Sequence, residues 1–356
     1  MARDTWDVAV VGATGAVGET MLSILAERGF PVGRVHAVAS SRSAGSRVAF
    51  GDDELTVEDL ATFDFSTVQI GLFSPGASVS DVHAPRAAAA GCTVIDNTSR
   101  FRYEDDVPLV VPEVNGHAIR RALEGPDARR IIANPNCSTI QMLVALKPLH
   151  DAFGIERINV CTYQAVSGTG KAAIEELGRQ TARLLNGLDV ASEVYPRQIA
   201  FNALPQIDVF QDNGYTKEEM KMVWETRKIL EDERIRVNPT CVRIPVFYGH
   251  SEAVHLETRR PVTAAEARNL LEAAPGVRVV DERADGGYPT AVTEAAGTDP
   301  VFVGRIREDI SCENGLDLWI VSDNVRKGAA LNSVQIAEAL VGEHLPAFRR
   351  GPRAAS

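Results

Sequence analysis

The chain lacks any long hydrophobic run. No stretch approaches the ~18 consecutive apolar residues that a membrane-spanning helix requires, although 45% of the 356 residues are hydrophobic. The first residues, MARDTWDVAVV, pass from charges straight into a strand-like run, without the apolar segment of a signal peptide. These absences predict a cytoplasmic protein that does not bind membranes.

Positive charge is also scarce. The 37 Lys and Arg are outnumbered by 48 Asp and Glu, which gives a net charge of −11. An acidic surface repels phosphodiester backbones, so nucleic-acid binding is not expected and any anion site must be local. The length and the hydrophobic content are sufficient for a large core, split over two domains.

Paired cysteine motifs are missing as well. The five cysteines are odd in number and form no CxxC pair, so the sequence predicts neither a disulfide framework nor a metal site. Four of them lie in or beside strand-like runs and are interpreted as buried thiols that act as small hydrophobic residues: Cys92, Cys161, Cys241 and Cys312. The fifth is Cys137, in NPNCST.

A nucleotide site is indicated near the start, in DVAVVGATGAVGETMLSILAERG. A short apolar strand is followed by a glycine turn and then by apolar residues at helical spacing. Glycines at GxxGxxG spacing let the backbone approach a pyrophosphate, whose charge a helix N-terminus stabilises. A tight turn without a ligand is the alternative. The cofactor-binding residues predicted here are Gly12, Thr14, Gly15, Ala16, Val17 and Gly18.

The second strand, RVHAVAS, ends in SSRSAG. Enzymes specific for NAD usually carry Asp or Glu at this point, whereas this chain has Ser40, Ser41, Arg42 and Ser43. Hydroxyls and a guanidinium suit a 2′-phosphate, so NADP is the predicted cofactor, with a polar surface loop as the alternative.

Further strand–helix units follow, which predicts an α/β fold with a doubly wound sheet. Ser74 and Gly76 follow the strand in TVQIGLFSPG and are predicted to border the cofactor. The strand-like runs LVVPEVN and RIIA close this half, and the alternation of strands and helices weakens near residue 134.

Cys137 stands between a polar turn and the apolar stretch IQMLVALKPL, a pattern typical of a helix start. A thiol at that point feels the positive end of the helix dipole, which lowers its pKa, and the neighbouring N–H groups can stabilise an oxyanion. The pattern indicates a nucleophile, and core packing is the alternative.

A nucleophilic cysteine needs a base, and the β-rich run RIPVFYGHSEAVHLET contains two histidines. Gly249 breaks the strand beside His250, whose side chain can then turn into a cleft. His255, five residues on, points to the opposite face of an unbroken strand. His250 is therefore the predicted base, with Glu252 as a partner that orients it.

Charged residues in the second half predict anion sites. Arg243, in an otherwise apolar strand, needs either an internal acid or a substrate carboxylate bound by two hydrogen bonds. Glu218 and Lys221 share a helical face at i,i+3 and form either a second anion site or a solvated salt bridge. AVSGTGKAA is not a P-loop, since Ala165 and Ala172 replace required residues; it is interpreted as a glycine loop that covers the cofactor.

Taken together, seven segments resemble the aspartate-β-semialdehyde dehydrogenase family over nearly the whole chain: VVGATGAVG, SSRSAG, NPNCST, TYQAVSGTG, NGYTKEEMK, RIPVFYGHSE and SDNVRKGAA. The resemblance implies an NADP-binding Rossmann domain of residues 1–134 and 330–356, interrupted by a catalytic and dimerisation domain of residues 135–329 with a mixed sheet. It also implies a homodimer built mainly through the inserted domain.

The resemblance assigns roles to single residues. Cys137 corresponds to the family's nucleophile, His250 to its acid/base, and Gln164 to the glutamine that orients the intermediate. The implied substrate-binding residues are Arg243 for the carboxylate, Glu218 for the amino group, and Lys221, Arg102 and Asn136 for the phosphate. Ser167, Gly168 and Asn324 are implied to adjoin the cofactor, and Ser46 departs from the family, in which many members carry lysine there.

The implied activity is the reversible NADPH-dependent reduction of L-4-aspartyl phosphate to L-aspartate 4-semialdehyde and phosphate, a step in the biosynthesis of lysine (through diaminopimelate), methionine, threonine and isoleucine. The acyl phosphate acylates Cys137, the thioester is reduced, and His250 takes up and returns the proton. The alternatives are an N-acetyl-γ-glutamyl-phosphate reductase, against which Glu218 argues, and a catalytically idle relative, against which Cys137, Gln164 and His250 argue.

Overall fold

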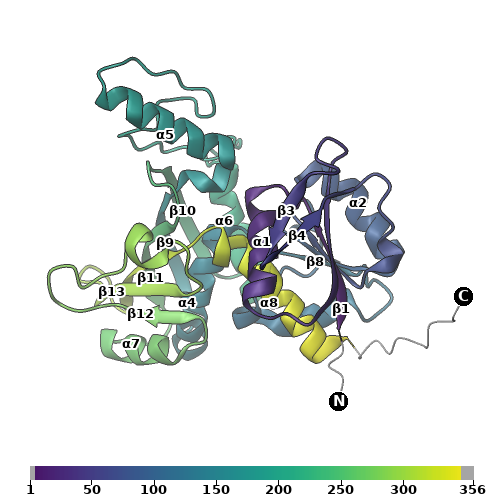
Figure 1. The fold of residues 1–356 in the computed structure, drawn as a ribbon. Coiled ribbons are helices and arrows are strands. Elements are labelled where there is room, and N and C mark those ends of the chain that lie inside the picture. Colours follow the sequence, from purple (N-terminus) through teal and green to yellow (C-terminus); the bar gives the residue numbers. More distant parts are fainter. Residues whose placement is uncertain (1–4, 346–356) are drawn as a thin grey trace, which may run out of the picture. The chain divides into compact units, whose positions relative to one another are not determined.

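The computed structural model describes residues 5–345, which form two compact units (Figure 1). The first unit comprises residues 5–134 and 330–345, and the second comprises residues 135–329. None of the helices in residues 5–345 has the length and apolar character needed to cross a membrane.

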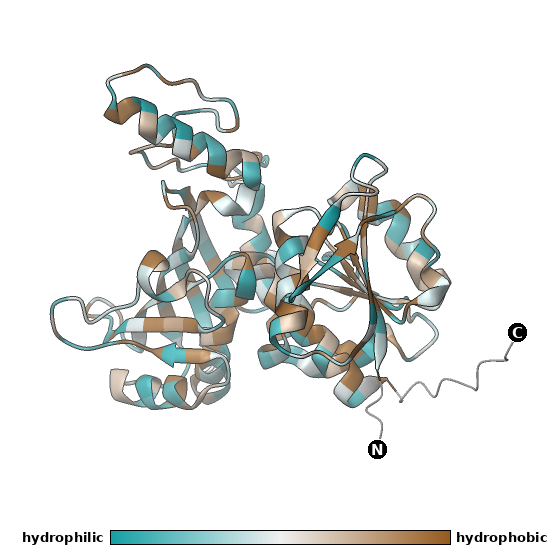
Figure 2. Cartoon of the chain, viewed as in Figure 1, coloured by the Kyte–Doolittle hydropathy of each residue, from teal (hydrophilic) through white to brown (hydrophobic). Residues whose placement is uncertain are grey.

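A six-stranded parallel sheet forms the centre of the first unit, in the order β5-β2-β1-β6-β7-β8. Its strands are β1 (Trp6–Val11), β2 (Val32–Ala39), β5 (Glu58–Asp59), β6 (Ile70–Phe73), β7 (Thr93–Asp96) and β8 (Ile131–Ala133). Every residue of β6 and β7 is buried, as expected of a parallel sheet covered on both faces. Figure 2 shows apolar residues on strands at the centre of this unit.

Helices cover both faces of this sheet. They are α1 (Ala16–Glu27), α2 (Ala77–Ala89) and α8 (Leu331–Ala339), with the hairpin β3 (Arg47–Phe50) and β4 (Asp53–Thr56) packed on α1. The crossovers through α1 and α2 run in opposite directions from the central β1–β6 pair, so the two helices lie on opposite faces (Figure 1). Arg28 joins α1 to α8 by two hydrogen bonds to Glu338, of 2.7 and 2.8 Å. The predicted doubly wound fold is confirmed.

One predicted strand of this unit is wrong. Within LVVPEVN only Leu109 forms a bridge, to Ala133, and the helix α3 (Pro112–Asn115) begins three residues later. Proline suits the first position of a helix because its φ is already helical and its missing N–H needs no partner there. The short helices η1 (Phe65–Thr67), η2 (Gly116–Ala122) and η6 (Leu340–His344) complete the unit.

A six-stranded mixed sheet forms the second unit, in the order β10-β9-β11-β14-β13-β12. Its strands are β9 (Ile155–Gln164), β10 (Arg236–Arg243), β11 (His250–Thr258), β12 (Val277–Val279), β13 (Val301–Glu308) and β14 (Gly315–Ser322). The helices are α4 (Cys137–Phe153), α5 (Lys171–Leu185), α6 (Lys217–Leu230) and α7 (Ala264–Ala273), with the shorter η3 (Val166–Thr169), η4 (Ala291–Ala295) and η5 (Arg326–Ala330).

The two faces of this mixed sheet differ. Helix α4 packs on β9, β11, β13 and β14, with α6 on β10 and α7 on β12 and β13. The opposite face, which we call the open face, carries half-exposed Cys161, Tyr163 and Trp319, and exposed His255. Helix α5 extends away from this sheet (Figure 1).

One prediction about this unit is confirmed and another is corrected in part. The run RIPVFYGHSEAVHLET is β-rich and broken, since β10 ends at Arg243 and β11 begins at His250, and both strands pair with β9. Gly249 breaks the chain between them with a φ of +87°, as predicted. Burial as a small hydrophobic residue is confirmed for Cys92 and Cys241 and is wrong for Cys161 and Cys312, which are half-exposed.

Candidate active site

Cys137 is the first residue of α4, and Asn136 caps that helix. The Asn136 side-chain oxygen accepts hydrogen bonds from the N–H groups of Ser138 and Thr139, at 3.1 and 3.3 Å. The Asn136 backbone N–H donates to the buried carboxylate of Glu225 at 2.6 Å. The predicted helix start is confirmed, and a half-buried Cys137 lies in the first turn, where helix dipoles favour negative charge.

Gly328 approaches Cys137 closely. A Cβ atom at Gly328 would lie 2.6 Å from the Cβ of Cys137 and 3.7 Å from the Cβ of Asn324. No side chain fits in that space. Gly328 is not among the residues predicted from the sequence, and its place within SDNVRKGAA is the local signal that points to it.

Glu218 binds three other predicted residues. Its Oε1 accepts from Asn136 Nδ2 at 2.9 Å and from Gln164 Nε2 at 3.1 Å, and its Oε2 accepts from Lys221 Nζ at 2.9 Å. Burial alone would raise the pKa of Glu218, but the Lys221 charge and these hydrogen bonds lower it to about 2. Glu218 is only 6% exposed, so the interpretation as a solvated salt bridge is wrong.

Both ends of this network are anchored. Gln164 Nε2 also donates to Ser138 Oγ at 2.5 Å, which ties the end of β9 to the first turn of α4. Lys221 Nζ also donates to Asp208 Oδ2 at 2.9 Å. The carboxylates of Glu218 and Asp208 together hold the pKa of Lys221 above its usual value despite burial.

His250 is fully buried, and a backbone group orients its ring. The N–H of Ala165 donates to His250 Nδ1 at 3.0 Å, so the neutral ring carries its proton on Nε2. That Nε2 has no hydrogen-bond partner among the described residues. Burial, with the nearby Arg243 charge, lowers the pKa of His250 to about 3, so the ring is neutral.

The predicted pairing of His250 with Glu252 is wrong. Neither carboxylate oxygen of Glu252 makes a hydrogen bond to any described residue, and the Nδ1 atom is already used by Ala165. Side chains two residues apart on one strand point to the same face but stand side by side, which leaves the ring nitrogens to groups on other elements.

Arg243 ends β10, in register with Gln164 on β9. Its Nη1 donates to the Ala165 carbonyl at 2.6 Å, and a Cβ at Gly168 would lie 3.3 Å from Nη1 and 3.6 Å from His250 Nε2. The guanidinium is buried, 6% exposed, and none of the carboxylates in residues 5–345 pairs with it. Because a buried charge without a counter-ion is costly, this site is suited to an anionic ligand.

Asn324 and Ser167 lie beside the same group of residues. Asn324 Oδ1 accepts from Ser167 Oγ at 3.0 Å and from the Gly249 N–H at 2.9 Å, and Asn324 is 3% exposed. These bonds hold the turn before His250 against the loop that contains Gly168. The second unit thus brings together all the predicted catalytic residues and four of the five substrate residues.

The remaining predicted substrate residue, Arg102, belongs to the first unit. Its Nη2 donates to the Asn97 carbonyl at 2.9 Å, and its side chain is largely buried. The same unit contains the predicted cofactor residues that precede residue 134.

The glycine turn after β1 makes backbone contacts that are too close for a side chain. Gly12 has a φ of +87°, and a Cβ there would lie 2.6 Å from the Ser74 carbonyl oxygen. A Cβ at Gly18 would lie 2.2 Å from the Gly12 carbonyl oxygen. Gly15 precedes α1 and offers no side chain to cap it, so the N–H groups of the first turn are available to an anion.

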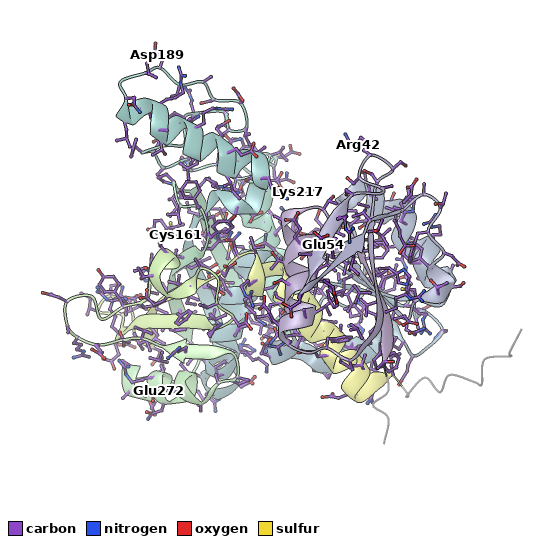
Figure 3. The ribbon with its side chains drawn as sticks, in the orientation of Figure 1. Arg42, Glu54, Cys161, Asp189, Lys217 and Glu272 are labelled. Carbon is purple, nitrogen blue, oxygen red and sulfur yellow. The ribbon has the colours of Figure 1, made fainter. Side chains whose placement is uncertain are left out.

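The loop that follows β2 carries the predicted 2′-phosphate residues. The Ser43 N–H donates to the Ser40 carbonyl at 2.8 Å, and Arg42 projects from the loop (Figure 3). Ser41 Oγ donates to Asp59 Oδ1 at 3.1 Å. Sequence reasoning missed Asp59, which reaches this loop because β5 pairs with the end of β2, a contact that no local pattern indicates.

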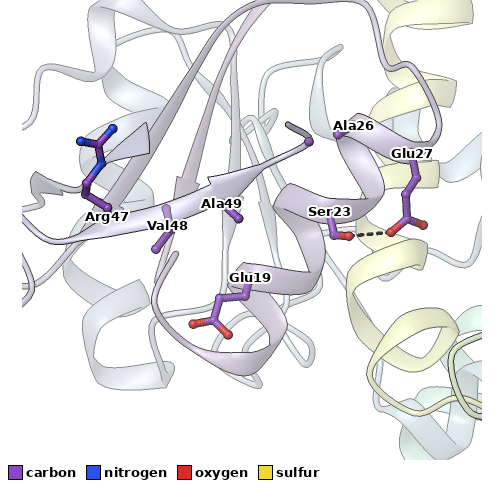
Figure 4. A pocket seen from close by; sticks show the side chains of 8 residues that line it. Glu19, Ser23, Ala26, Glu27, Arg47, Val48 and Ala49 are labelled. Carbon is purple, nitrogen blue, oxygen red and sulfur yellow. Dashed lines mark hydrogen bonds between the residues drawn. The ribbon is translucent and has the colours of Figure 1, made fainter. Parts of the chain in front are cut away.

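A pocket of about 600 Å³ lies between α1 and the β3–β4 hairpin (Figure 4). It is lined by Glu19, Ser23, Ala26, Glu27, Arg47, Val48, Ala49 and Gly51, none of them a predicted site residue. Ser23 donates to Glu27 and Arg47 pairs with Glu54, so its polar groups already have partners on the protein.

One group of potential metal ligands occurs among the described residues: His255, Asp309 and Asp317. His255 pairs with Asp317, whose second oxygen lies 3.2 Å from Arg307 Nη2. These protein partners already balance the Asp317 charge, so we assign no metal to this group.

The chain is similar to known proteins along most of its length. Residues 7–122 match the NAD binding domain of semialdehyde dehydrogenases, and residues 146–327 match their dimerisation domain. An aspartate-semialdehyde dehydrogenase of Legionella pneumophila is 64% identical over 339 residues, which are 95% of this chain and 96% of that protein.

Solved structures agree. Aspartate semialdehyde dehydrogenase II of Vibrio cholerae, complexed with ASA, has a TM-score of 0.93 and 57% identity, covering 96% of this chain and 99% of that one. An aspartate semialdehyde dehydrogenase of Candida albicans with NADP has a TM-score of 0.74 and 26% identity, covering 95% and 98%. The chain therefore belongs to the semialdehyde dehydrogenase family, among the aspartate-semialdehyde dehydrogenases.

Proposed function

We propose that this protein catalyses the reversible NADPH-dependent reduction of L-4-aspartyl phosphate to L-aspartate 4-semialdehyde and phosphate, in the biosynthesis of lysine, methionine, threonine and isoleucine. The names of its relatives support this activity. The observation that carries it is the buried guanidinium of Arg243, which has no carboxylate partner within residues 5–345 and lies beside His250 in the unit that also holds Cys137 at a helix start. A substrate carboxylate supplies the missing counter-charge.

Cys137 is the proposed nucleophile. Its thiolate attacks the acyl phosphate carbonyl, the carbon–oxygen bond to phosphate breaks, and a thioester on Cys137 results. A bound nicotinamide cofactor supplies the hydride that reduces this thioester. The thiohemiacetal oxyanion then re-forms its carbonyl and expels the Cys137 thiolate, which releases the aldehyde and restores the enzyme.

His250 acts in this scheme through Nε2. Both tetrahedral species on Cys137 carry an oxyanion, and the neutral ring offers an Nε2–H donor because Ala165 occupies Nδ1. Attack by the Cys137 thiolate and the hydride transfer need no proton, and the one proton that the overall reaction consumes goes to the departing phosphate, which leaves the acyl phosphate dianion as PO₄³⁻ and becomes HPO₄²⁻. We therefore assign His250 the role of hydrogen-bond donor to the oxyanion, in place of the proton uptake expected from the sequence. Gln164, tied to Ser138 and Glu218, positions the thioester.

The other substrate contacts follow from charge. Arg243 binds the carboxylate, and Glu218 binds the amino group by exchanging one of its present donors. Lys221 and Arg102 are assigned to the phosphate, for which Lys221 must leave Asp208. Both polar groups of the Asn136 side chain bond within the protein, so Asn136 contributes by positioning Cys137.

We assign NADP to the first unit and catalysis to the second. The uncapped first turn of α1 fits a pyrophosphate held by Thr14, Gly15, Ala16, Val17 and Gly18, and Gly12 lets the turn before it pack against the Ser74 backbone. Ser40, Ser41, Arg42 and Ser43 fit the 2′-phosphate, and the Candida relative with NADP supports this choice. Ser74 and Gly76 border the same turn, and Ser167, Gly168 and Asn324 are assigned to the nicotinamide end.

The protein is a homodimer, and we propose the open face of the mixed sheet as its interface. This face lies within the residues that match a dimerisation domain, and it exposes aromatic side chains such as Tyr163 and Trp319. We also propose the cytoplasm as its location, where a catalytic thiol stays reduced; all five cysteines are free.

The test is a phosphate-dependent assay. Aspartate semialdehyde is supplied with NADP or NAD, with and without phosphate, and the absorbance of the reduced nicotinamide is followed. A phosphate-stimulated signal supports the proposal. Activity on the N-acetylglutamate analogue alone, or no signal with either cofactor, overturns it.

A further inference from the structure

Glu252 is a buried carboxyl group that the proposed reaction leaves without a role. It lies two residues after His250 on β11, and the two side chains share the face of the sheet that α4 covers. Glu252 is 0% exposed, and neither of its oxygens has a hydrogen-bond partner among the described residues. An ionised carboxylate is costly to bury in this way.

The groups around Glu252 are polar but uncharged. Gln141 lies on α4, one turn after Cys137, and its Nε2 donates to the His250 carbonyl at 3.4 Å. Thr162 on β9 is in register with Glu252. In the part of the chain that the structure describes, the Oε1 of Gln141 and the Oγ1 of Thr162 also have no hydrogen-bond partner, so the cluster contains acceptors that a carboxylic acid proton can satisfy.

No ion pair links Glu252 to a cation among the described residues. The elements packed around it carry the titratable groups His250 on β11, Cys241 on β10, Glu218 and Glu219 on α6, and Cys137 at the start of α4. The cations Arg243 on β10 and Lys221 on α6 bond to other groups, which are the Ala165 carbonyl and the carboxylates of Glu218 and Asp208. Burial raises the pKa of Glu252 well above its usual value, and the Gln141 amide only partly opposes this. The neighbouring strand β14 contributes Ile320, which does not titrate.

We propose that Glu252 is a positioning residue for the reaction: as a neutral carboxylic acid it holds Gln141, and through Gln141 it fixes the first turns of α4, with Cys137, against His250. The proposal rests on the proposed function for its kinetic consequence only. The Gln141 amide lies between the His250 carbonyl and Glu252, so this side chain connects the helix of the nucleophile to the strand of the oxyanion donor.

A consequence at alkaline pH follows. Ionisation of Glu252 removes its donor and introduces a negative charge beneath the helix turn that carries the Cys137 thiolate. Without the donor, Gln141 no longer holds the first turns of α4 in place. The new negative charge also disfavours the Cys137 thiolate, because like charges repel strongly where water is excluded. The wild-type enzyme therefore loses turnover at high pH through a group that Glu252→Gln removes.

The experiment compares the wild type, Glu252→Gln and Glu252→Ala, with Glu272→Gln on α7 as a surface control. kcat and KM are measured from pH 6 to 10, and alkylation of Cys137 by iodoacetamide is followed over the same range without substrate or cofactor. Circular dichroism and gel filtration report folding and dimerisation.

We expect Glu252→Gln to keep kcat within about threefold of the wild type at pH 7 and to lack the alkaline fall of the wild type. Glu252→Ala lowers kcat by about 10- to 100-fold with KM within about threefold, and slows alkylation, since a misplaced reacting group costs rate more than binding. Glu272→Gln behaves as the wild type.

Two results overturn the proposal. One is a Glu252→Gln variant that is as inactive as Glu252→Ala, which means that the negative charge is required. The other is a wild type and Glu252→Gln with the same pH profiles of kcat and alkylation. If Glu252→Ala does not fold, the comparison of the pH profiles of the wild type and Glu252→Gln alone tests the proposal. Alkylation needs no substrate, so a failure of the proposed function leaves that test intact.

Discussion

The backbone N–H of Ala165 donates to Nδ1 of His250 over 3.0 Å, and this bond determines which ring nitrogen faces the reaction. With a pKa lowered to about 3, chiefly by burial, His250 stays neutral from about pH 4 upward. We expect kcat/KM to show no inflection near 6.5, the value of an unperturbed histidine.

The same geometry predicts that His250→Ala lowers kcat by about 10²–10³, the usual cost of removing an oxyanion donor. The matched control is His83→Asn in α2, which should retain the wild-type kcat. A titration near pH 6.5 that disappears in His250→Ala would contradict the neutral-donor role and restore proton uptake by this ring.

We predict that Arg243 strengthens substrate binding and lowers the thermal stability of the free protein. Replacing it with Gln removes a buried charge that has no carboxylate partner, so thermal unfolding of the free protein should occur at an equal or higher temperature. The KM for aspartate semialdehyde should rise by about 100-fold, the equivalent of about 3 kcal/mol for a charge-assisted pair. Calorimetry and steady-state kinetics measure the two effects. A fall of the melting temperature by more than about 4 °C would mean that Arg243 is satisfied internally.

We predict that the contribution of Glu218 to the free energy of unfolding is lost in acid. Its pKa falls from 4.5 in the unfolded chain to about 2 in the folded protein, so its contribution is present above pH 4.5 and is lost as the pH falls toward 2. At about 1.4 kcal/mol per pH unit, this contribution is on the order of 3 kcal/mol. Urea unfolding of the wild type and Glu218→Gln should show a difference at pH 7 that narrows below pH 4.5. A constant difference would assign the effect to packing alone.

We predict that a side chain at position 328 displaces the nucleophile, Cys137. Because a Cβ at this position would lie 2.6 Å from the Cβ of Cys137, Gly328→Ala must displace one of them. We expect kcat to fall by about 100-fold with little loss of stability. Gly178→Ala in α5 is the control, since a Cβ there meets nothing within 4 Å and should add about 0.5–1 kcal/mol of helix stability. An active Gly328→Ala enzyme would show that the Cys137 position is not constrained.

Local chemistry explains which site features were predictable. NPNCST predicts the start of α4 because an N-cap side chain bonds to backbone N–H groups only two and three residues ahead. The structure confirms that start at Cys137. The break at Gly249 is predictable because a positive φ, here +87°, is a local property that favours glycine. The doubly wound sheet followed from alternating apolar runs, as the observed order of β1, β6 and β7 confirms.

The unpredicted features depend on contacts between distant segments. The partner of His250 is the backbone N–H of Ala165, which directly follows β9, and no residue type reveals such a partner, whereas Glu252 is only near His250 in sequence. LVVPEVN reads as a strand by composition, but Pro112 starts a helix there. Cys161 belongs to an apolar strand, yet its side chain points to the open face, because the facing alternates along β9.

We predict that replacing Asp59 shifts the cofactor preference further toward NADP. Its carboxylate accepts a hydrogen bond from Ser41 at 3.1 Å, within the loop assigned to the 2′-phosphate, so it competes for that hydroxyl and repels a phosphate. We expect Asp59→Asn to raise kcat/KM for NADP relative to NAD by about fivefold, equivalent to about 1 kcal/mol.

Arg42→Ala should act in the opposite direction, because Arg42 is an exposed cation of that loop and a guanidinium binds phosphate strongly. We expect kcat/KM for NADP to fall by about tenfold while the value for NAD stays unchanged, and Asp52→Asn in the β3–β4 turn serves as the charge control. If Asp59→Asn and Asp52→Asn raise NADP use equally, the effect is one of net charge. If Arg42→Ala affects both cofactors alike, the loop binds a part that NAD and NADP share, and the 2′-phosphate must be recognised elsewhere.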